Sequence, residues 1–458
     1  MTRADVELPG DICGWVADLG GGRLVRVTRV PGGARREAWL VDVERRDGSI
    51  AELFLRYDRT DPQETVDPWT LHREASVYLA LQNTDVLVPR VLGVHPVHQA
   101  MLSERLVGGN WFSRITDAEE ALATARHFME QLAALHRLDP SMLDLPDFPA
   151  SSTIPNAVVH ELDEWDRIIE QRDGEPEPLL EFALGWLRRN VPDHDGPVVL
   201  VQGDTGPGNF MYAGGRVIAV VDWELAHLGD PMDDIAWLSL RATQEPFPGF
   251  TARLREYEEL SGHAIDIDRV RYYQVMAETK LQVMAHGARR AASGGGGDPG
   301  NRLIYGLLHR RLWLEALAAV IGIEPTRVEI PPQSQPGPHA ALYDVALDQL
   351  REVIVPSIDD PLAQTRAKGL ARVIKYLASV DADGDFYDAC EMADIEALVG
   401  SSAGSLTTAR EAVVEAARAG AVDIADYLRY LWRRSDRETE LARPAMGVLA
   451  DRHWPRLT

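Results

Sequence analysis

Lysine is scarce in this sequence. Only three lysines, Lys280, Lys368 and Lys375, stand among its 47 basic residues, so arginine supplies almost all of the positive charge. The planar guanidinium group of arginine binds a carboxylate or a phosphate through two parallel hydrogen bonds, whereas the lysine ammonium group acts as a point charge. Any function of the first half of the chain that needs a fixed cation must therefore use arginine.

Cysteine and long apolar runs are scarce as well. The two cysteines, Cys13 and Cys390, lie far apart, which indicates neither a disulfide framework nor a zinc site. No apolar run approaches the roughly 20 residues that a membrane-spanning helix needs. The first residues, MTRADVELPGDICGW, are too polar for a signal peptide, so we expect a cytoplasmic protein without a membrane partner.

The chain also lacks an excess of positive charge. Its formal net charge is −24, which argues against nucleic acid or an anionic membrane as a partner and would attract cationic substrates. An acidic surface that keeps the protein soluble explains the same charge. The hydrophobic share of 45% is ordinary for a globular protein, and a chain of 458 residues predicts roughly two or three domains.

Residues 1–106 have the pattern of a small α/β unit. Three strand-like segments, 23–30, 38–43 and 50–57, are joined by short turns and predict an antiparallel meander. Apolar residues at helical spacing predict a helix within 69–83. Two further strand-like stretches complete the unit before a glycine-containing connection.

The remainder of the chain is predicted to be mainly helical. Within 107–329, the segment 119–139 is a long amphipathic helix, and the segment 198–223 reads as a strand, a glycine-rich loop and a hairpin. The stretch IPPQSQPGPH, residues 330–339, has the composition of a linker. Residues 340–458 read as an all-helical domain, which we expect to fold independently and to pack within itself, on the preceding part or on a second copy of the chain.

Polar residues interrupt the apolar pattern of the hairpin region. Asp204, Asn209 and Asp222 are all poor strand residues. Hairpin pairing returns Asp222 to the neighbourhood of Asn209, so that a carboxylate and an amide can bind one hard cation through oxygen, with Asp204 as a second carboxylate. Phosphoryl transfer needs a base and two such oxygen ligands. Turn and strand-end capping explains each residue singly, but the spacing D-x-x-x-x-N matches the catalytic loop of protein kinases.

The segments QGDTGPGN and VVDWELAHLGDPMDDIAWL resemble the aminoglycoside phosphotransferase (phosphotransferase enzyme) family, whose pattern is HGD-x-x-x-x-N, then D-W/F-E and GDP-x-x-D. The resemblance covers roughly residues 20–325. It implies an α+β, two-lobed protein-kinase-like fold, with an antiparallel-sheet N-lobe, a mainly helical C-lobe and ATP between them. It also implies that Asp204 is the catalytic base and that Asn209 and Asp222 are Mg²⁺ ligands.

The same resemblance assigns nucleotide-binding residues in the N-lobe. Gly32 and Gly33, in PGGARREAWLV, stand where the family has its phosphate loop, although an ordinary hairpin turn explains them equally well. Arg56 stands where kinases place a strand lysine, and Glu74 where a helix supplies that lysine's partner. An exposed ion pair is the alternative for these two residues.

The junction of the lobes is expected at Glu104 to Leu106, whose backbone groups would face adenine. Two departures from the family pattern are Gln202 in place of histidine and Arg56 in place of lysine. Both leave open a degenerate kinase that binds nucleotide without transferring phosphate.

Four other polar residues are expected to have structural roles. We expect His136 to be a core or capping residue and His227 to make a loop hydrogen bond. Asp230 and Asp234 are expected to fix the hairpin and the next helix by capping.

The resemblance implies an ATP- and Mg²⁺-dependent kinase that phosphorylates a hydroxyl group of a small molecule. The acidity favours a cationic aminoglycoside-like acceptor. The form ELAHLGDPMDDIAWL is closer to phosphotransferase domains fused to acyl-CoA dehydrogenases, which implies a hydroxyacyl-CoA. Such an acceptor would need a basic patch, for which Arg289, Arg290, Arg310 and Arg311 are candidates. The alternative is a regulatory or scaffold protein whose helical tail recruits a partner.

Overall fold

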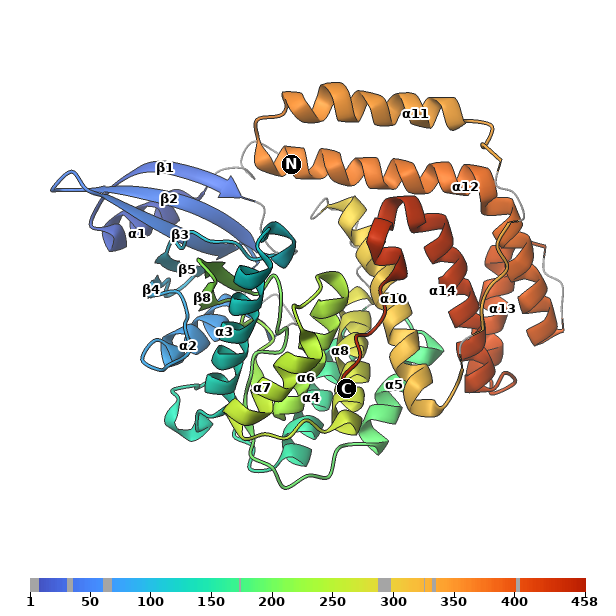
Figure 1. The fold of residues 1–458 in the computed structure, drawn as a ribbon, viewed down its shortest axis with the longest axis horizontal. Coiled ribbons are helices and arrows are strands. Elements are labelled where there is room, and N and C mark those ends of the chain that lie inside the picture. Colours follow the sequence, from blue (N-terminus) through green and yellow to red (C-terminus); the bar gives the residue numbers. More distant parts are fainter. Residues whose placement is uncertain are drawn as a thin grey trace.

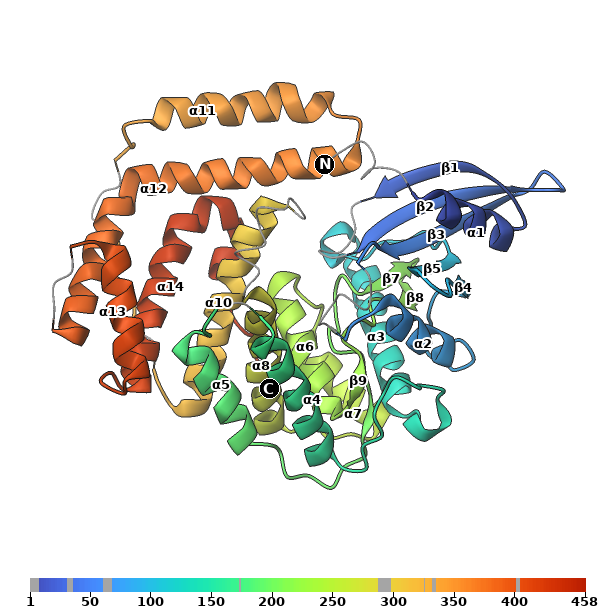
Figure 2. The same ribbon diagram turned by 180° about the vertical axis from the view of Figure 1, so that it is seen from behind.

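The computed structural model describes residues 8–30, 36–60, 68–172, 174–286, 298–324, 326–331, 335–400 and 404–458. Within them the chain forms a small sheet-containing lobe, a larger helical lobe and a helical tail (Figures 1 and 2). This is the two-lobed α+β arrangement that the resemblance implies.

The N-lobe is built on a five-stranded antiparallel sheet with the strand order β1-β2-β3-β5-β4. The strands are β1 (Gly22–Val30), β2 (Glu37–Arg45), β3 (Ile50–Asp58), β4 (Val91–Val94) and β5 (Gln99–Glu104). Alternate residues of β2, β3 and β5 are buried against α1 (Gly10–Gly20), which the sequence analysis did not anticipate. The predicted helix is α2 (Leu71–Leu81). Thr70 caps its N-terminus, because the Thr70 side chain accepts a hydrogen bond from the Arg73 N–H.

The C-lobe consists of helices around two short ribbons. One ribbon pairs β6 (Val199–Val201) with β9 (His227–Gly229), and the other is the predicted hairpin of β7 (Phe210–Ala213) and β8 (Arg216–Val220). The helices are α3 (Ala118–His136), α4 (Ile154–Glu170), α5 (Pro178–Arg189), α6 (Pro231–Gln244), α7 (Phe250–Ser261), α8 (Ile267–Ala285) and α10 (Pro299–Ile321).

The described part of the tail contains four helices, α11 (Ala340–Gln349), α12 (Pro361–Val399), α13 (Leu406–Arg418) and α14 (Ile424–Met446). Figures 1 and 2 show α11 and α12 running side by side along the edge of the molecule, while α14 packs on α10. Short 3₁₀ or π segments are η2 (Phe112–Arg114), η3 (Pro140–Met142), η5 (Leu350–Ile354), η6 (Val355–Ser357) and η7 (Gly447–Asp451). None of the helices in the described ranges has the length and apolar character needed to cross a membrane.

The tail and the C-lobe share one hydrophobic core. Tyr427, Leu428 and Leu431 of α14 are buried in the same cluster as Trp313 of α10. The indole N–H of Trp454, near the C-terminus, donates to the Leu312 carbonyl oxygen at 3.0 Å. This packing of α14 on the C-lobe argues against the independently folding tail that the sequence analysis expects, and that expectation stays a prediction for a truncated chain to test.

The domain boundaries expected at residues 106, 329 and 339 stay predictions. The described part of the expected linker, residues 330–331 and 335–339, contains neither helix nor strand.

Candidate active site

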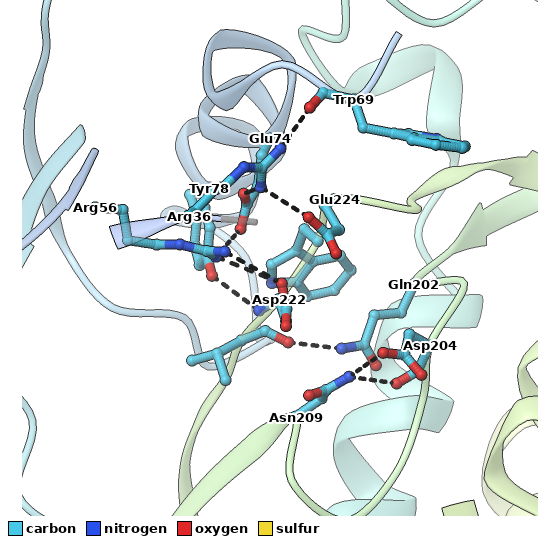
Figure 3. Close-up of polar contacts among 12 residues, drawn as sticks. Arg36, Arg56, Trp69, Glu74, Tyr78, Gln202, Asp204, Asn209, Asp222 and Glu224 are labelled. Carbon is cyan, nitrogen blue, oxygen red and sulfur yellow. Dashed lines mark hydrogen bonds and ion pairs between the residues drawn. The ribbon is translucent and has the colours of Figure 1, made fainter. Parts of the chain in front are cut away.

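The loop between β6 and β7, residues 202–209, carries the predicted base at its start (Figure 3). Gly203 has a φ of 80°, and a Cβ atom there would lie 2.3 Å from the carbonyl oxygen of Leu225. Only glycine allows the loop to leave β6 in this direction.

Asp234, in the first turn of α6, holds this loop in place. Its carboxylate is fully buried and accepts hydrogen bonds from the N–H groups of Gln202 at 2.9 Å and Gly203 at 3.0 Å. The Thr205 hydroxyl and the Nε2 atom of buried His136, at 2.9 Å, bind the same carboxylate. The expected capping role belongs to Asp230 alone, which accepts from the N–H of Met232. Asp234 fixes the catalytic loop instead.

The carboxylate of Asp204 is held by two side chains. Arg241 of α6 donates from Nε to Oδ1 at 2.7 Å and from a second nitrogen to Oδ2. The Nδ2 atom of Asn209 donates to Oδ2 at 2.7 Å. Burial raises the pKa of Asp204, and the charge of Arg241 acts against this shift. The sequence analysis missed Arg241. An arginine in the last turn of a helix has the same sequence pattern whether it faces solvent or an active site.

Asp222 follows β8 in an unusual backbone conformation. Its φ of 65° is positive, which is true of no other non-glycine residue in the described ranges. Such a conformation costs about 1–3 kcal/mol and is kept only where the surroundings impose it. The Asp222 N–H donates to the Tyr78 hydroxyl at 3.0 Å, and the neighbouring Val221 N–H donates to the Asn209 carbonyl at 2.9 Å. The hairpin thus brings Asp222 beside Asn209, as the spacing predicts.

Gln202 connects the two halves of this arrangement. Its side-chain amide donates to the Val221 carbonyl oxygen at 2.7 Å, so it ties the start of the catalytic loop to the strand that leads into Asp222. The residue that replaces the family's histidine therefore keeps a positioning contact.

An ion-pair network links the N-lobe to Asp222 (Figure 3). Arg56 of β3 pairs with Glu74 of α2, and its other terminal nitrogen lies 3.4 Å from an oxygen of Asp222. Arg36 pairs with the second oxygen of Glu74 and lies 3.2 Å from Glu224. Glu74 is fully buried and the Arg56 side chain is 14% exposed, so the alternative of an exposed pair is excluded.

Glu224 is the glutamate of the D-W-E motif, and the sequence analysis did not select it. Burial and the nearby charge of Asp222 raise the pKa of Glu224 to about 7, although Arg36 acts in the opposite direction. The sequence analysis missed Arg36 as well. Its role follows from its partners in space, because it pairs with Glu74 and donates a hydrogen bond to the Trp69 carbonyl oxygen.

The lobe junction is described, whereas the phosphate loop is not. Gly32 and Gly33 lie outside the described residues. The Glu104 side chain accepts from the Arg90 N–H at 2.8 Å and is therefore engaged within its own lobe. The backbone of Leu106 has no hydrogen-bond partner among the described residues, so its N–H and C=O can bind a ligand.

The basic patch suggested for a CoA-type acceptor does not form as expected. Arg310 pairs with Glu177 at 2.5 Å, and Arg311 donates to backbone carbonyls that include Ala450 at 2.6 Å. Both guanidinium groups are committed to structure. Arg289 and Arg290 lie outside the described residues.

A second group of ionisable side chains surrounds His227. Its Nδ1 atom lies 3.0 Å from the Leu225 carbonyl, which is the expected loop contact, and its Nε2 atom faces Glu161 and Asp233. The ammonium group of Lys280 lies 2.5 Å from Glu161 and 3.3 Å from Asp233. Lys280 neutralises these carboxylates, so we interpret the group as a structural ion-pair network beside β9.

The sequence model of the "Phosphotransferase enzyme family" matches residues 26–273, more than half of the chain. The chain belongs to this family. This membership agrees with the resemblance of the loop and hairpin motifs. Among solved structures, it is similar to choline kinase LicA from Streptococcus pneumoniae, with 14% identity and a TM-score of 0.49 over 68% of this chain and 98% of that one.

Another similar structure is a thermostable mutant of aminoglycoside phosphotransferase APH(4)-Ia in a ternary complex with ADP and hygromycin B. It is 17% identical, with a TM-score of 0.45, over 61% of this chain and 92% of that one.

Curated relatives include acyl-CoA dehydrogenase family member 11 of Pongo abelii and of Rattus norvegicus. The first is 31% identical over 229 residues, which are 45% of this chain and 29% of the relative. The second is 34% identical over 128 residues, which are 28% of this chain and 16% of the relative. The chain thus spans less than a third of the length of these relatives.

Proposed function

We propose that the protein is an ATP- and Mg²⁺-dependent kinase that transfers the γ-phosphoryl group to a hydroxyl group of a small molecule. This proposal rests on the observation that three residues selected from the sequence lie together in the structure. Asp204 and Asn209 are hydrogen-bonded to each other, and Asn209 is joined through the hairpin backbone to the residue before Asp222.

Asp204 is proposed as the base. The acceptor hydroxyl would donate its hydrogen bond to this carboxylate and lose its proton to it during transfer. In the structure Arg241 binds both oxygens of Asp204, so an acceptor has to replace at least one of these bonds.

Asn209 and Asp222 fit a Mg²⁺ ion. Asn209 uses its amide nitrogen on Asp204, which leaves its amide oxygen for a metal. One oxygen of Asp222 faces Arg56, and the other has no hydrogen-bond partner among the described residues. Hard oxygen ligands of this kind suit Mg²⁺, which would neutralise charge on the nucleotide phosphates.

The N-lobe is proposed to hold ATP. The fork of Arg56, oriented by Glu74, would bind the phosphates. The backbone amides at Gly32 and Gly33 would cover them, and the backbone of Glu104 to Leu106 would face adenine.

For the acceptor we propose an acyl-CoA-type hydroxy metabolite ahead of an aminoglycoside-like alcohol. The partial match to acyl-CoA dehydrogenase family members supports this order. The structural contacts of Arg310 and Arg311 argue in the other direction, because a CoA-type acceptor needs cations for its phosphates. We propose that the protein works in the cytoplasm on a small molecule, without a nucleic-acid or membrane partner.

The experiment is a phosphoryl-transfer assay with Mg·ATP and separate acceptors, namely 3- and 4-hydroxyacyl-CoA, choline and kanamycin, with product identified by ³¹P NMR. We expect a hydroxyacyl-CoA to be phosphorylated and Asp204→Asn to lower kcat at least about 10²-fold with little change in ATP affinity. ATP binding without transfer to any acceptor would favour the alternative, a regulatory nucleotide-binding protein, which the covering of Asp204 by Arg241 also fits.

A further inference from the structure

The candidate active site contains more carboxylates than cations. Its carboxylates are Asp204, Asp222, Glu74 and Glu224, and its cations are Arg36, Arg56 and Arg241. Arg36 and Arg56 both bind Glu74, and Arg56 also faces Asp222. The two N-lobe arginines are therefore largely neutralised before any phosphate arrives.

Arg241 is the cation beside the base. Its Nε atom lies 2.7 Å from Asp204 Oδ1, and its side chain is 19% exposed. The catalytic loop packs directly on it, because Gly206 has a φ of 138° and a Cβ atom there would lie 2.7 Å from the Arg241 Cβ. Loop and arginine thus form one packed unit.

We propose that Arg241 moves from the Asp204 carboxylate to the γ-phosphoryl group of ATP during transfer. This inference rests on the proposed kinase function. An acceptor oxygen bonded to Asp204 must come within about 3–3.5 Å of the phosphorus, so a guanidinium group bound to the same carboxylate lies within reach of the phosphoryl oxygens. Arg241 exchanges one anionic partner for another and is never left unpaired.

The transfer moves one proton and one phosphoryl group. The acceptor O–H bond breaks and its proton passes to Asp204, while the acceptor oxygen forms a bond to the γ-phosphorus. The bond from this phosphorus to the oxygen that bridges to the β-phosphate breaks, and its electron pair leaves with ADP. Arg241 donates hydrogen bonds to the oxygens of the transferred group, where charge is concentrated in the transition state.

The test compares Arg241→Gln with Arg269→Gln in the full-length protein. Arg269 is the matched control, because it binds Asp230 through the same two-nitrogen arrangement away from the base. We expect Arg241→Gln to lower kcat at least about 10²-fold with an ATP KM within about threefold of the parent. Arg241→Lys should recover part of the loss.

An equal loss of kcat in Arg241→Gln and Arg269→Gln, or a normal kcat in Arg241→Gln, would overturn the inference while leaving the kinase function intact. Absence of transfer by the parent protein would overturn the proposed function and this inference with it.

A separate observation concerns the charges along α12. Its first half, residues 361–380, contains four basic residues and no acidic one, whereas residues 381–399 contain acidic residues and no basic one. The basic residues are Arg366, Lys368, Arg372 and Lys375. No carboxylate within the described ranges pairs with them, and two of them bind neutral amides instead.

The same helix presents apolar side chains to solvent. Leu370, Leu377 and Val380 are 46%, 44% and 37% exposed, at intervals of seven and three residues that place them on one face. An exposed apolar stripe of this kind favours a helical partner.

We infer that a second copy of the chain pairs antiparallel along α12, with the two-fold axis near Leu377. This pairing sets the basic half of each helix against the exposed acids in the second half of the other, with Arg366 opposite Asp388. Glu391 and Asp394 take no part, because they already pair with arginines of their own chain. Parallel pairing would bring like charges together. The contact is self-complementary, as a two-fold dimer requires.

Light scattering on the full-length protein tests this dimer. We expect a dimer that Leu377→Asp converts to a monomer, while Met142→Asp, at an 82% exposed site, leaves it unchanged. Arg366→Glu should weaken the dimer and Asp388→Arg in the same chain should restore it. A monomeric parent protein, or a dimer unaffected by Leu377→Asp, would overturn the inference.

Discussion

At the scale of single residues, Arg56 joins carboxylates from two lobes. Glu74 belongs to α2 of the N-lobe and Asp222 follows β8 of the C-lobe, and Arg56 directs a different edge of its fork toward each. A lysine ammonium group on a flexible stem cannot hold this bridging geometry with a fixed plane. The arginine is therefore suited to a site with two carboxylates to span.

Arg56→Ala should raise the KM for ATP about tenfold or more, because the phosphates lose the oriented cation of the N-lobe. Arg56→Lys should have a smaller effect, since charge is kept and one arm is lost. Steady-state kinetics with varied ATP measure both. Arg23→Ala is the control, because the Arg23 side chain is 77% exposed in its pair with Glu44. An unchanged KM in Arg56→Ala would contradict a phosphate contact.

Glu224 should make stability depend on pH. Its pKa is about 7 in the folded state, compared with an ordinary value of 4.5, because burial, Asp222 and Glu74 outweigh Arg36 and Arg56. As pH rises, the unfolded chain loses this proton first, so the free energy of unfolding falls between about pH 4.5 and 7 and then levels off.

Glu224→Gln should lack this fall. Relative to the parent protein, its Tm should therefore be higher at about pH 8 than at about pH 5. Thermal melting at both pH values measures the difference, with Glu411→Gln at an exposed site as control. A Tm difference that does not change with pH would contradict the raised pKa.

At the scale of elements, the catalytic loop depends on glycine where it passes Arg241. Gly206 combines a positive φ with close contact to the Arg241 side chain. Gly214, in the β7–β8 turn, has a φ of 54°, and a Cβ atom there would meet no other atom within 4 Å. A side chain would strain the backbone at either glycine, but only at Gly206 would it also displace a residue of the site. Substitutions at the two positions therefore distinguish the two effects.

Gly206→Ala should lower kcat at least about tenfold, because the new methyl group displaces Arg241 and with it Asp204. Gly214→Ala should cost only about 1 kcal/mol of unfolding free energy and leave kcat unchanged. Kinetics and denaturant unfolding of both variants provide the comparison. Equal kcat in the two variants would show that the loop tolerates a shift of Arg241.

The elements that sequence reasoning found have strong local signals. The β7–β8 hairpin is marked by two glycines between apolar strands, and α2 by apolar residues at helical spacing. Asp204, Asn209 and Asp222 stood out because each breaks an apolar pattern. Arg241 and Glu224 did not stand out, because a polar residue on a helix or beside a motif breaks no apolar pattern. Only tertiary packing brings these two residues to the site.

At the scale of the whole molecule, the tail shares a hydrophobic core with the C-lobe. Its helices read as a separate unit because a proline-rich stretch precedes them and because amphipathic periodicity shows that a face is buried but not which surface buries it. The structure supplies the missing partner, which is α10. The same limit explains why α1 was missed, since its buried face depends on the sheet.

A chain that ends at residue 335 should therefore aggregate or melt without cooperativity. Its α10 would lose the cover of Tyr427, Leu428 and Leu431, which are all buried, at about 1.5–3 kcal/mol for each large side chain. Leu431→Ala in the full chain should lower the free energy of unfolding by about 2–5 kcal/mol, whereas Leu342→Ala, at a 68% exposed site on α11, should change it little. Calorimetry and light scattering report both effects. A truncated chain that melts cooperatively and binds Mg·ATP would show that the C-lobe closes its core without α14, and the independent tail expected from the sequence would be restored.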